Sequence, residues 1–191
     1  MNYGETSAYW YLRLNGFFLI QNFVIHRTEE IKHSSDIDLL GIRLPYVFEE
    51  VGGQPGDWDA VLLEELNPNL PTGIICEVKT GDFDEKKLFR QHYLSYSLDR
   101  FGFQPNLSEC TKTIASNKLT EIEYKGTRFQ ILKLFVSNSQ AKRLDFLQLS
   151  IKHLRAFIER RIQNYRDKKW QDRLLFQSDF LGEYIDRLFN E

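Results

Sequence analysis

The stretch Ile75-Cys76-Glu77-Val78-Lys79-Thr80-Gly81 ends the strand around which we expect the fold to be arranged. An apolar run leads into this stretch and predicts a buried strand. Side chains alternate between the two faces of a strand, so Glu77 and Lys79 share one face. Cys76 and Val78 then point to the core on the other face. Because a buried charge is costly unless it is paired or ligated, the pattern indicates a polar site on a core strand.

A second acidic stretch, Ser35-Asp36-Ile37-Asp38-Leu39-Leu40-Gly41, lies earlier in the chain and is also predicted to be a strand. The alternation places Asp36 and Asp38 on one face and Ile37 on the other. We interpret Asp36 as a solvated neighbour. Two carboxylates on adjacent strands repel each other unless a cation lies between them, and oxygen ligands favour Mg²⁺ or Mn²⁺ over zinc. Asp38 and Glu77 are therefore the predicted ligands of a divalent cation.

The remaining segments place these strands in a mixed α/β arrangement. We predict a helix over 5–15, strands over 17–26, 36–44 and 72–80, helices over 83–98 and from 106 or 108 to 119, a hairpin of 121–124 and 127–136, a strand over 144–149, and helices over 151–165 and 179–189. The loop-rich segment 46–73 contains a short strand or helical turn near 59–66. Consecutive early strands without helices between them exclude a doubly wound sheet.

Length and composition are those of one globular domain. The 191 residues are 42% hydrophobic and 27% charged, which excludes disordered and fibrous proteins. Two cysteines without a C-x-x-C pair exclude a disulfide scaffold and give no zinc motif. The first residues lack a secretory leader pattern, and no apolar run approaches the ~20 residues that span a bilayer. We expect a cytoplasmic protein without a membrane partner.

The two halves of the chain differ in charge. Residues 1–85 hold 5 Lys/Arg against 15 Asp/Glu, whereas residues 86–191 hold 20 against 12. An acidic half joined to a basic half is compatible with a metal site beside a polyanion-binding surface. The alternative is chance segregation of charge over two solvated faces.

Together these features resemble the PD-(D/E)XK superfamily of restriction-endonuclease-like nucleases. The resemblance depends on a leading helix with Glu5, the stretch Asp38-Leu39-Leu40-Gly41-Ile42-Arg43-Leu44-Pro45, and the stretch Glu77-Val78-Lys79-Thr80-Gly81. The resemblance covers residues 5 to about 100. The stretches that begin at Asp38 and Glu77 also look like those of small stand-alone prokaryotic members of the superfamily. The resemblance implies a single domain over 1–191: an αβββαβ core with a mixed β-sheet flanked by helices over 1–140, and a helical C-terminal extension over 141–191.

The resemblance also implies roles for individual residues. Asp38 and Glu77 would bind Mg²⁺ or Mn²⁺, with help from the Val78 carbonyl. Lys79 would serve the attacking water and the scissile phosphate. Glu5 would contribute from the first helix, directly or through a metal-bound water.

Four features depart from the pattern or leave an alternative open. Ile37 precedes Asp38 where the family often has proline, and the 39-residue gap to Glu77 requires the 46–73 segment to loop out. Asp59, only 18 residues before Glu77, is a rival ligand, although the strand of Asp38 is longer and more apolar. Glu77 and Lys79 could otherwise form an ion pair on a solvated sheet face, worth about 0.2–1 kcal/mol.

Candidate nucleic-acid contacts follow the Lys79 strand. In the resembled fold the next helix borders the active site, so phosphate contacts are predicted for Lys86, Lys87, Arg90 and Gln91, against a solvated helix face as the alternative. Gln91 matches the first position of a Gln-x-x-x-Tyr motif, in which Ser95 replaces the tyrosine. Residues 140–175 hold 10 Lys/Arg against 4 Asp/Glu, with Tyr165 and Trp170 among them. This segment forms either a groove that binds the backbone of a nucleic-acid strand, with aromatic rings for stacking, or a solvated basic helix face.

The predicted function is that of a divalent-metal-dependent nuclease. It would hydrolyse phosphodiester bonds, with DNA as the default substrate because most relatives in the resembled superfamily act on DNA. A homodimer is compatible with double-strand cleavage. The alternative is a catalytically inert module of the same fold that binds nucleic acid or protein.

Overall fold

The computed structural model describes residues 2–25, 35–103, 107–165, 182–183 and 187. The elements in chain order are α1 (Tyr3–Leu14), β1 (Phe18–Ile25), β2 (Ser35–Arg43), α2 (Ala60–Leu63), β3 (Thr72–Lys79), the 3-10 turn η1 (Glu85–Lys87), α3 (Gln91–Phe101), α4 (Leu107–Ser116), β4 (Leu119–Tyr124), β5 (Thr127–Ser137), β6 (Leu147–Leu149) and α5 (Ile151–Asn164). No helix in the described ranges is long and apolar enough to cross a membrane.

The strands form one open, mixed sheet of six strands, which confirms the predicted mixed α/β class. The order is β1-β2-β3-β5-β4, and β6 also pairs with β5. The pairs β1–β2, β2–β3 and β4–β5 are antiparallel, whereas β3 and β6 both run parallel to β5. Strand β3 is therefore central, and all its residues except the last are buried.

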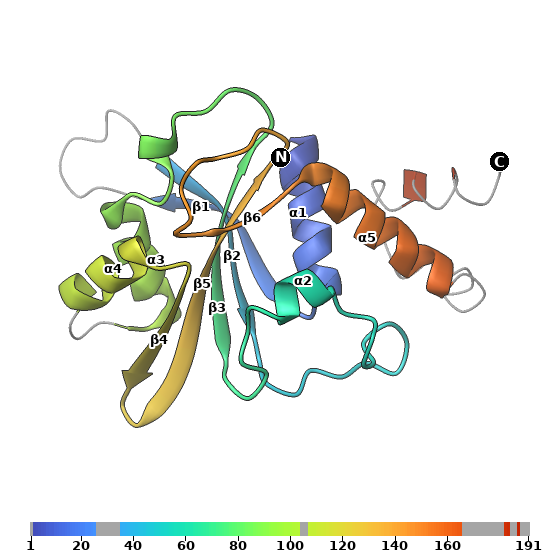
Figure 1. The fold of residues 1–191 in the computed structure, drawn as a ribbon. Helices are drawn as coiled ribbons and strands as arrows, with labels where there is room; N and C mark the ends of the chain where they lie inside the picture. The colour runs from blue at the N-terminus through green and yellow to red at the C-terminus, as the bar shows by residue number, and fades with distance from the viewer. Residues whose placement is uncertain (1, 26–34, 104–106, 166–181, 184–186, 188–191) are drawn as a thin grey trace.

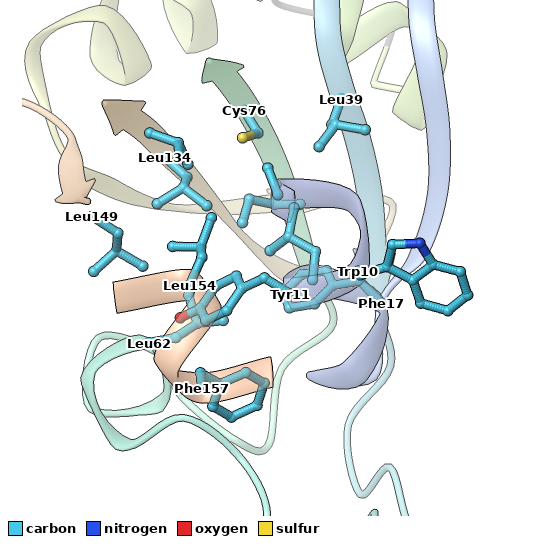
Figure 2. Close-up of a cluster of buried hydrophobic side chains, with 14 of the residues drawn as sticks. Trp10, Tyr11, Phe17, Leu39, Leu62, Cys76, Leu134, Leu149, Leu154 and Phe157 are labelled. Atoms are coloured by element: carbon cyan, nitrogen blue, oxygen red, sulfur yellow. The ribbon is translucent and has the colours of Figure 1, made fainter. Parts of the chain in front are cut away.

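Helices cover both faces of the sheet. Figure 1 shows α1 and α5 on one face and α3 and α4 on the other. On the first face, Cys76 from β3 and Leu134 from β5 pack with Tyr11 of α1 and Phe157 of α5 (Figure 2). On the second face, Ile75 belongs to a separate buried cluster with residues of α3 and α4. These two cores fix the faces of β3, so Cys76 lies in the core on the α1 and α5 side, as the alternation predicts.

Local sequence signals explain most element boundaries. Asn2 and Glu5 form a capping box at the start of α1, and Ser150 caps α5. The predicted hairpin turn at Lys125-Gly126 is confirmed, and both residues have positive φ, 49° and 76°. The prediction near 59–66 is settled as a short helix, α2.

The single helix predicted over 83–98 is wrong. Asp84 caps the short turn η1, and α3 begins only at Gln91. Phe89, between them, has a φ of 50°, in the left-handed region that an α-helix cannot contain. The helix predicted over 179–189 lies almost entirely outside the described residues.

Candidate active site

Strands β2 and β3 separate at the point where their acidic residues lie. The last paired residues are Leu39 and Cys76, and one further step in this register brings Asp38 and Glu77 opposite each other. Beyond this point β3 stays paired only with β5, where Glu77 lies beside Phe135. The two carboxylates therefore meet where the pairing of β2 with β3 ends, on the side of the sheet covered by α3.

The regular alternation of side chains between the two faces of β2 stops at Asp38. Ile37, predicted on the face opposite Asp38, instead packs in the same core as Leu40. On β1, Asn22 lies opposite Asp38 in the register and has a φ of 47°. The left-handed conformation of Asn22 interrupts the β1–β2 ladder beside Asp38, and the two-residue alternation of side chains fails at that point. Nothing is described of the Asp36 side chain.

Lys79 bridges the two carboxylates. Its Nζ lies 3.2 Å from Asp38 Oδ2 and 3.1 Å from Glu77 Oε2. Asp38 Oδ2 also accepts a hydrogen bond of 2.7 Å from the Val78 backbone N–H. The structure thus brings together Asp38, Glu77 and Lys79, which we name the β3 cluster.

The β3 cluster combines strong burial with an opening to solvent. The side chains of Glu77, Asp38 and Lys79 are 5%, 14% and 36% exposed. Burial raises the pKa of Glu77 to about 7, although Lys79 acts against this shift. Burial alone would lower the pKa of Lys79, but the charges of Glu77 and Asp38 outweigh it and raise that pKa. At neutral pH Lys79 is therefore a cation, and Glu77 is present in both its protonated and its ionised form.

The predicted phosphate-contact residues lie in the segment that leads into α3. Arg90, at the N-cap of α3, is close enough for its charge to lower the pKa of Glu77. Lys86 and Lys87 are exposed on η1, and exposed Gln91 begins α3. The predicted phosphate-contact residues thus occupy one exposed segment, in which Arg90 is the residue placed near Glu77, and their binding to nucleic acid stays a prediction.

A buried lysine that is not among the sequence-predicted site residues anchors this segment. Lys133 of β5 is fully buried, and its Nζ lies 2.8 Å from Asp145 Oδ2. Asp145 also pairs with Arg143, which donates hydrogen bonds to the carbonyls of Glu85 and Leu88. The available signal was a lysine in the middle of an apolar strand.

Glu5 has a structural partner. Its carboxylate accepts hydrogen bonds from the backbone N–H and the side-chain amide of Asn2, which completes the capping box of α1. Gly4 lies against β3, since a Cβ there would be 2.6 Å from Thr80 Cγ2. The start of α1 is therefore near the end of β3, and the predicted role of Glu5 at a metal stays a prediction.

Asp59, the rival ligand, lies on the other side of the sheet. Its carboxylate caps α2 through the Val61 N–H at 3.0 Å and pairs with His153 Nε2 of α5 at 2.6 Å. Its backbone N–H donates to Asn15 at the end of α1. The acid that the fold brings to Glu77 is therefore Asp38.

A second polar cluster surrounds Asp59 and likewise was not predicted from the sequence. Arg161 is only 2% exposed and donates to the Asp57 carbonyl, and its guanidinium lies 5.5 Å from the centre of the Trp58 ring. We name Asp57, Asp59, His153 and Arg161 the α5 cluster. Of the basic stretch 140–175, described up to 165, Arg161 is therefore unavailable to a solvent-facing groove. Trp170 lies outside the described residues.

The donor set of the β3 cluster fits a magnesium-like ion. Within the described ranges, no group of three or more His, Cys, Asp or Glu side chains is placed to hold a metal. Mg²⁺, however, commonly uses one or two carboxylates and keeps several waters. Lys79 Nζ marks a position where positive charge lies about 3 Å from both Asp38 and Glu77. The Val78 carbonyl as a further ligand stays a prediction.

Comparison with known proteins does not place the chain in a family. No family model matches it, and it has no match among curated proteins or solved structures.

Proposed function

We propose that the chain is a divalent-metal-dependent nuclease of the PD-(D/E)XK type, with Mg²⁺ or Mn²⁺ held by Asp38 and Glu77. The observation that carries the proposal is the placement of a buried carboxylate, a half-buried carboxylate and a lysine where two central strands stop pairing. DNA is the proposed substrate, because most proteins of the resembled superfamily act on DNA.

The residues of the β3 cluster have distinct tasks in this proposal. A divalent cation would polarise the scissile phosphate and lower the pKa of a water. Lys79, kept protonated by its two neighbours, donates hydrogen bonds to the water and to the charge that develops on the phosphate. Glu77 would have to release its proton to hold the metal, so metal affinity would rise with pH through about 7.

One observation favours a second candidate, an inert module that binds nucleic acid. Lys79 already compensates much of the negative charge of Asp38 and Glu77, so the β3 cluster is also a plausible structural ion triad. The two candidates differ in metal dependence, since an inert module binds without metal-dependent cleavage.

The test compares wild type, Glu77→Gln and Lys79→Ala on labelled single-stranded, duplex and branched DNA and on RNA. Each is incubated with Mg²⁺, Mn²⁺ or EDTA at low salt. We expect cleavage by wild type that EDTA abolishes, no cleavage by Glu77→Gln, and a loss of about 10²-fold or more for Lys79→Ala. Lys118→Ala is the matched control, because Lys118 is 37% exposed and pairs with Glu65 elsewhere on the molecule.

A calorimetric titration with Mg²⁺ or Mn²⁺ tests the ligands separately from cleavage. Binding by wild type should be lost in Asp38→Ala and in Glu77→Ala. Metal-independent binding of DNA without cleavage by any variant would favour the inert module. Equal cleavage by wild type and Glu77→Gln would reject the site.

A further inference from the structure

A recess lies between the first turns of α1 and α5. Its volume is about 610 Å³, within the ~300–1,000 Å³ of ordinary ligand pockets. Figure 1 shows that both helices begin at the end of the sheet where β3 ends. The residues that line it include Tyr3, Thr80, Lys152, Arg155 and Glu159. We name it the α1/α5 recess.

The α1/α5 recess joins positive charge to an aromatic ring. Lys152 and Arg155 are three residues apart on α5 and so share one face of the helix. The Arg155 guanidinium lies 5.6 Å from the centre of the Tyr3 ring, and Tyr3 is 48% exposed. Together they provide two cations and a ring face in a concave site.

The carboxylates near the α1/α5 recess are already engaged. Glu159, which lines it, lies 2.9 Å from Arg187. Glu5 accepts two hydrogen bonds from Asn2 in the capping box. With Arg187 beside Glu159, the cations Lys152, Arg155 and Arg187 outnumber the one carboxylate that lines the recess, and the recess favours an anion.

The α1/α5 recess adjoins the β3 cluster. Thr80 lines it and directly follows Lys79 in the chain. On the opposite layer, Arg90 is close enough to Glu77 for its charge to lower the pKa of that carboxyl. Basic side chains thus flank the β3 cluster on both sides of the sheet end.

We propose that the α1/α5 recess binds a single-stranded segment of nucleic acid next to the bond that the β3 cluster cleaves. Lys152 and Arg155 contact backbone phosphates, and Tyr3 stacks on a base. A base must leave the double helix to reach a ring in a recess, which is why the occupant is a single strand. The identity of the occupant rests on the proposed nuclease function.

The test measures binding without cleavage. A fluorescein-labelled DNA strand of about 12 nucleotides is titrated with protein in EDTA, and fluorescence anisotropy is recorded at several salt concentrations. Relative to wild type, the double variant K152A/R155A should bind about 10-fold or more weakly. Its slope of log affinity against log salt should be smaller by about 1.4, because each lost phosphate contact removes ~0.7. Tyr3→Leu should bind about fivefold more weakly with an unchanged slope.

The matched control is the double variant K125A/R128A. It also removes one lysine and one arginine, but at the β4–β5 turn at the other end of the sheet. Equal weakening in both double variants would mean a general charge effect and would overturn the inference. So would no binding by wild type, wild-type affinity in K152A/R155A, or an unlabelled blunt duplex that competes as well as an unlabelled single strand. Competition by inorganic phosphate alone at the same concentration would also overturn it.

Failure of this inference differs from failure of the proposed function. Cleavage by wild type with unaltered binding by K152A/R155A rejects the recess and leaves the nuclease. Weakened binding by K152A/R155A without metal-dependent cleavage by wild type supports the recess and rejects the nuclease.

Discussion

The β3 cluster and the α5 cluster lie on opposite faces of the same sheet and use the same kinds of charge differently. In the α5 cluster each carboxylate has two partners: Asp57 accepts from the Gln54 N–H and the Tyr165 hydroxyl, and Asp59 accepts from the Val61 N–H and pairs with His153. In the β3 cluster one lysine serves both Asp38 and Glu77, and the Val78 N–H donates to the same Asp38 oxygen, Oδ2. Asp59 thus has a partner at each carboxylate oxygen, whereas the contacts that Asp38 and Glu77 make with the described residues fall on one oxygen each and leave the other for a ligand.

The small number of donors at Glu77 affects its pKa. A buried carboxylate with few donors keeps its proton to a higher pH, and burial raises the pKa of Glu77 to about 7. Strongly shifted groups at an opening are typical of functional sites. Three predictions test whether the two clusters differ in this way.

The largest effect is expected in the α5 cluster. Arg161→Ala should lower the free energy of unfolding by about 3–5 kcal/mol, because it removes a buried cation and leaves the Asp57 carbonyl without that donor. Urea unfolding followed by circular dichroism measures the loss. Arg160→Ala is the control, because Arg160 is exposed and its removal should cost under about 0.5 kcal/mol. Similar losses in the two variants would mean that Arg161 contributes no more than a surface arginine.

The next effect concerns the pH dependence of stability through Glu77. Its pKa is about 7 in the folded chain against an ordinary value of 4.5, so the folded state binds the proton more tightly than the unfolded state. The stabilisation from this proton is complete below about pH 4.5 and is lost as the pH rises through about 7. The total is about 3 kcal/mol, from about 1.4 kcal/mol per unit of pKa.

Glu77→Gln isolates that contribution. Between pH 4.5 and 8.5 wild type should lose about 3 kcal/mol more stability than Glu77→Gln in urea unfolding, since all other titrating groups are shared. Glu65→Gln is the control, because Glu65 pairs with Lys118 near the surface. A wild type that follows the same pH profile as Glu77→Gln would contradict the raised pKa.

The sequence predicts the sheet and much of the β3 cluster, for identifiable reasons. Alternation along an apolar strand depends only on local geometry, so the shared face of Glu77 and Lys79 could be predicted. The break at Phe89 could not, because a left-handed φ in a non-glycine residue depends on tertiary packing. Arg161 and Asp57 are 104 residues apart and meet only through the α5 packing, so no local pattern indicates their contact. The choice between Asp38 and Asp59 likewise depends on the path of the 46–71 loop.

The smallest effect is expected for Asp59→Asn. Asparagine caps a helix as well as aspartate does, so the cap of α2 is kept and only the charge that pairs with His153 is removed. The loss of unfolding free energy should be under about 1 kcal/mol in urea. Metal binding by calorimetry and cleavage should match wild type, whereas Asp38→Asn should lose both. Metal binding that disappears in Asp59→Asn and persists in Asp38→Asn would mean that Asp59 is the ligand, although both of its carboxylate oxygens have partners. That result would contradict the comparison of the two clusters, because an acid with partners at both carboxylate oxygens would then bind the metal and an acid with a vacant oxygen would not.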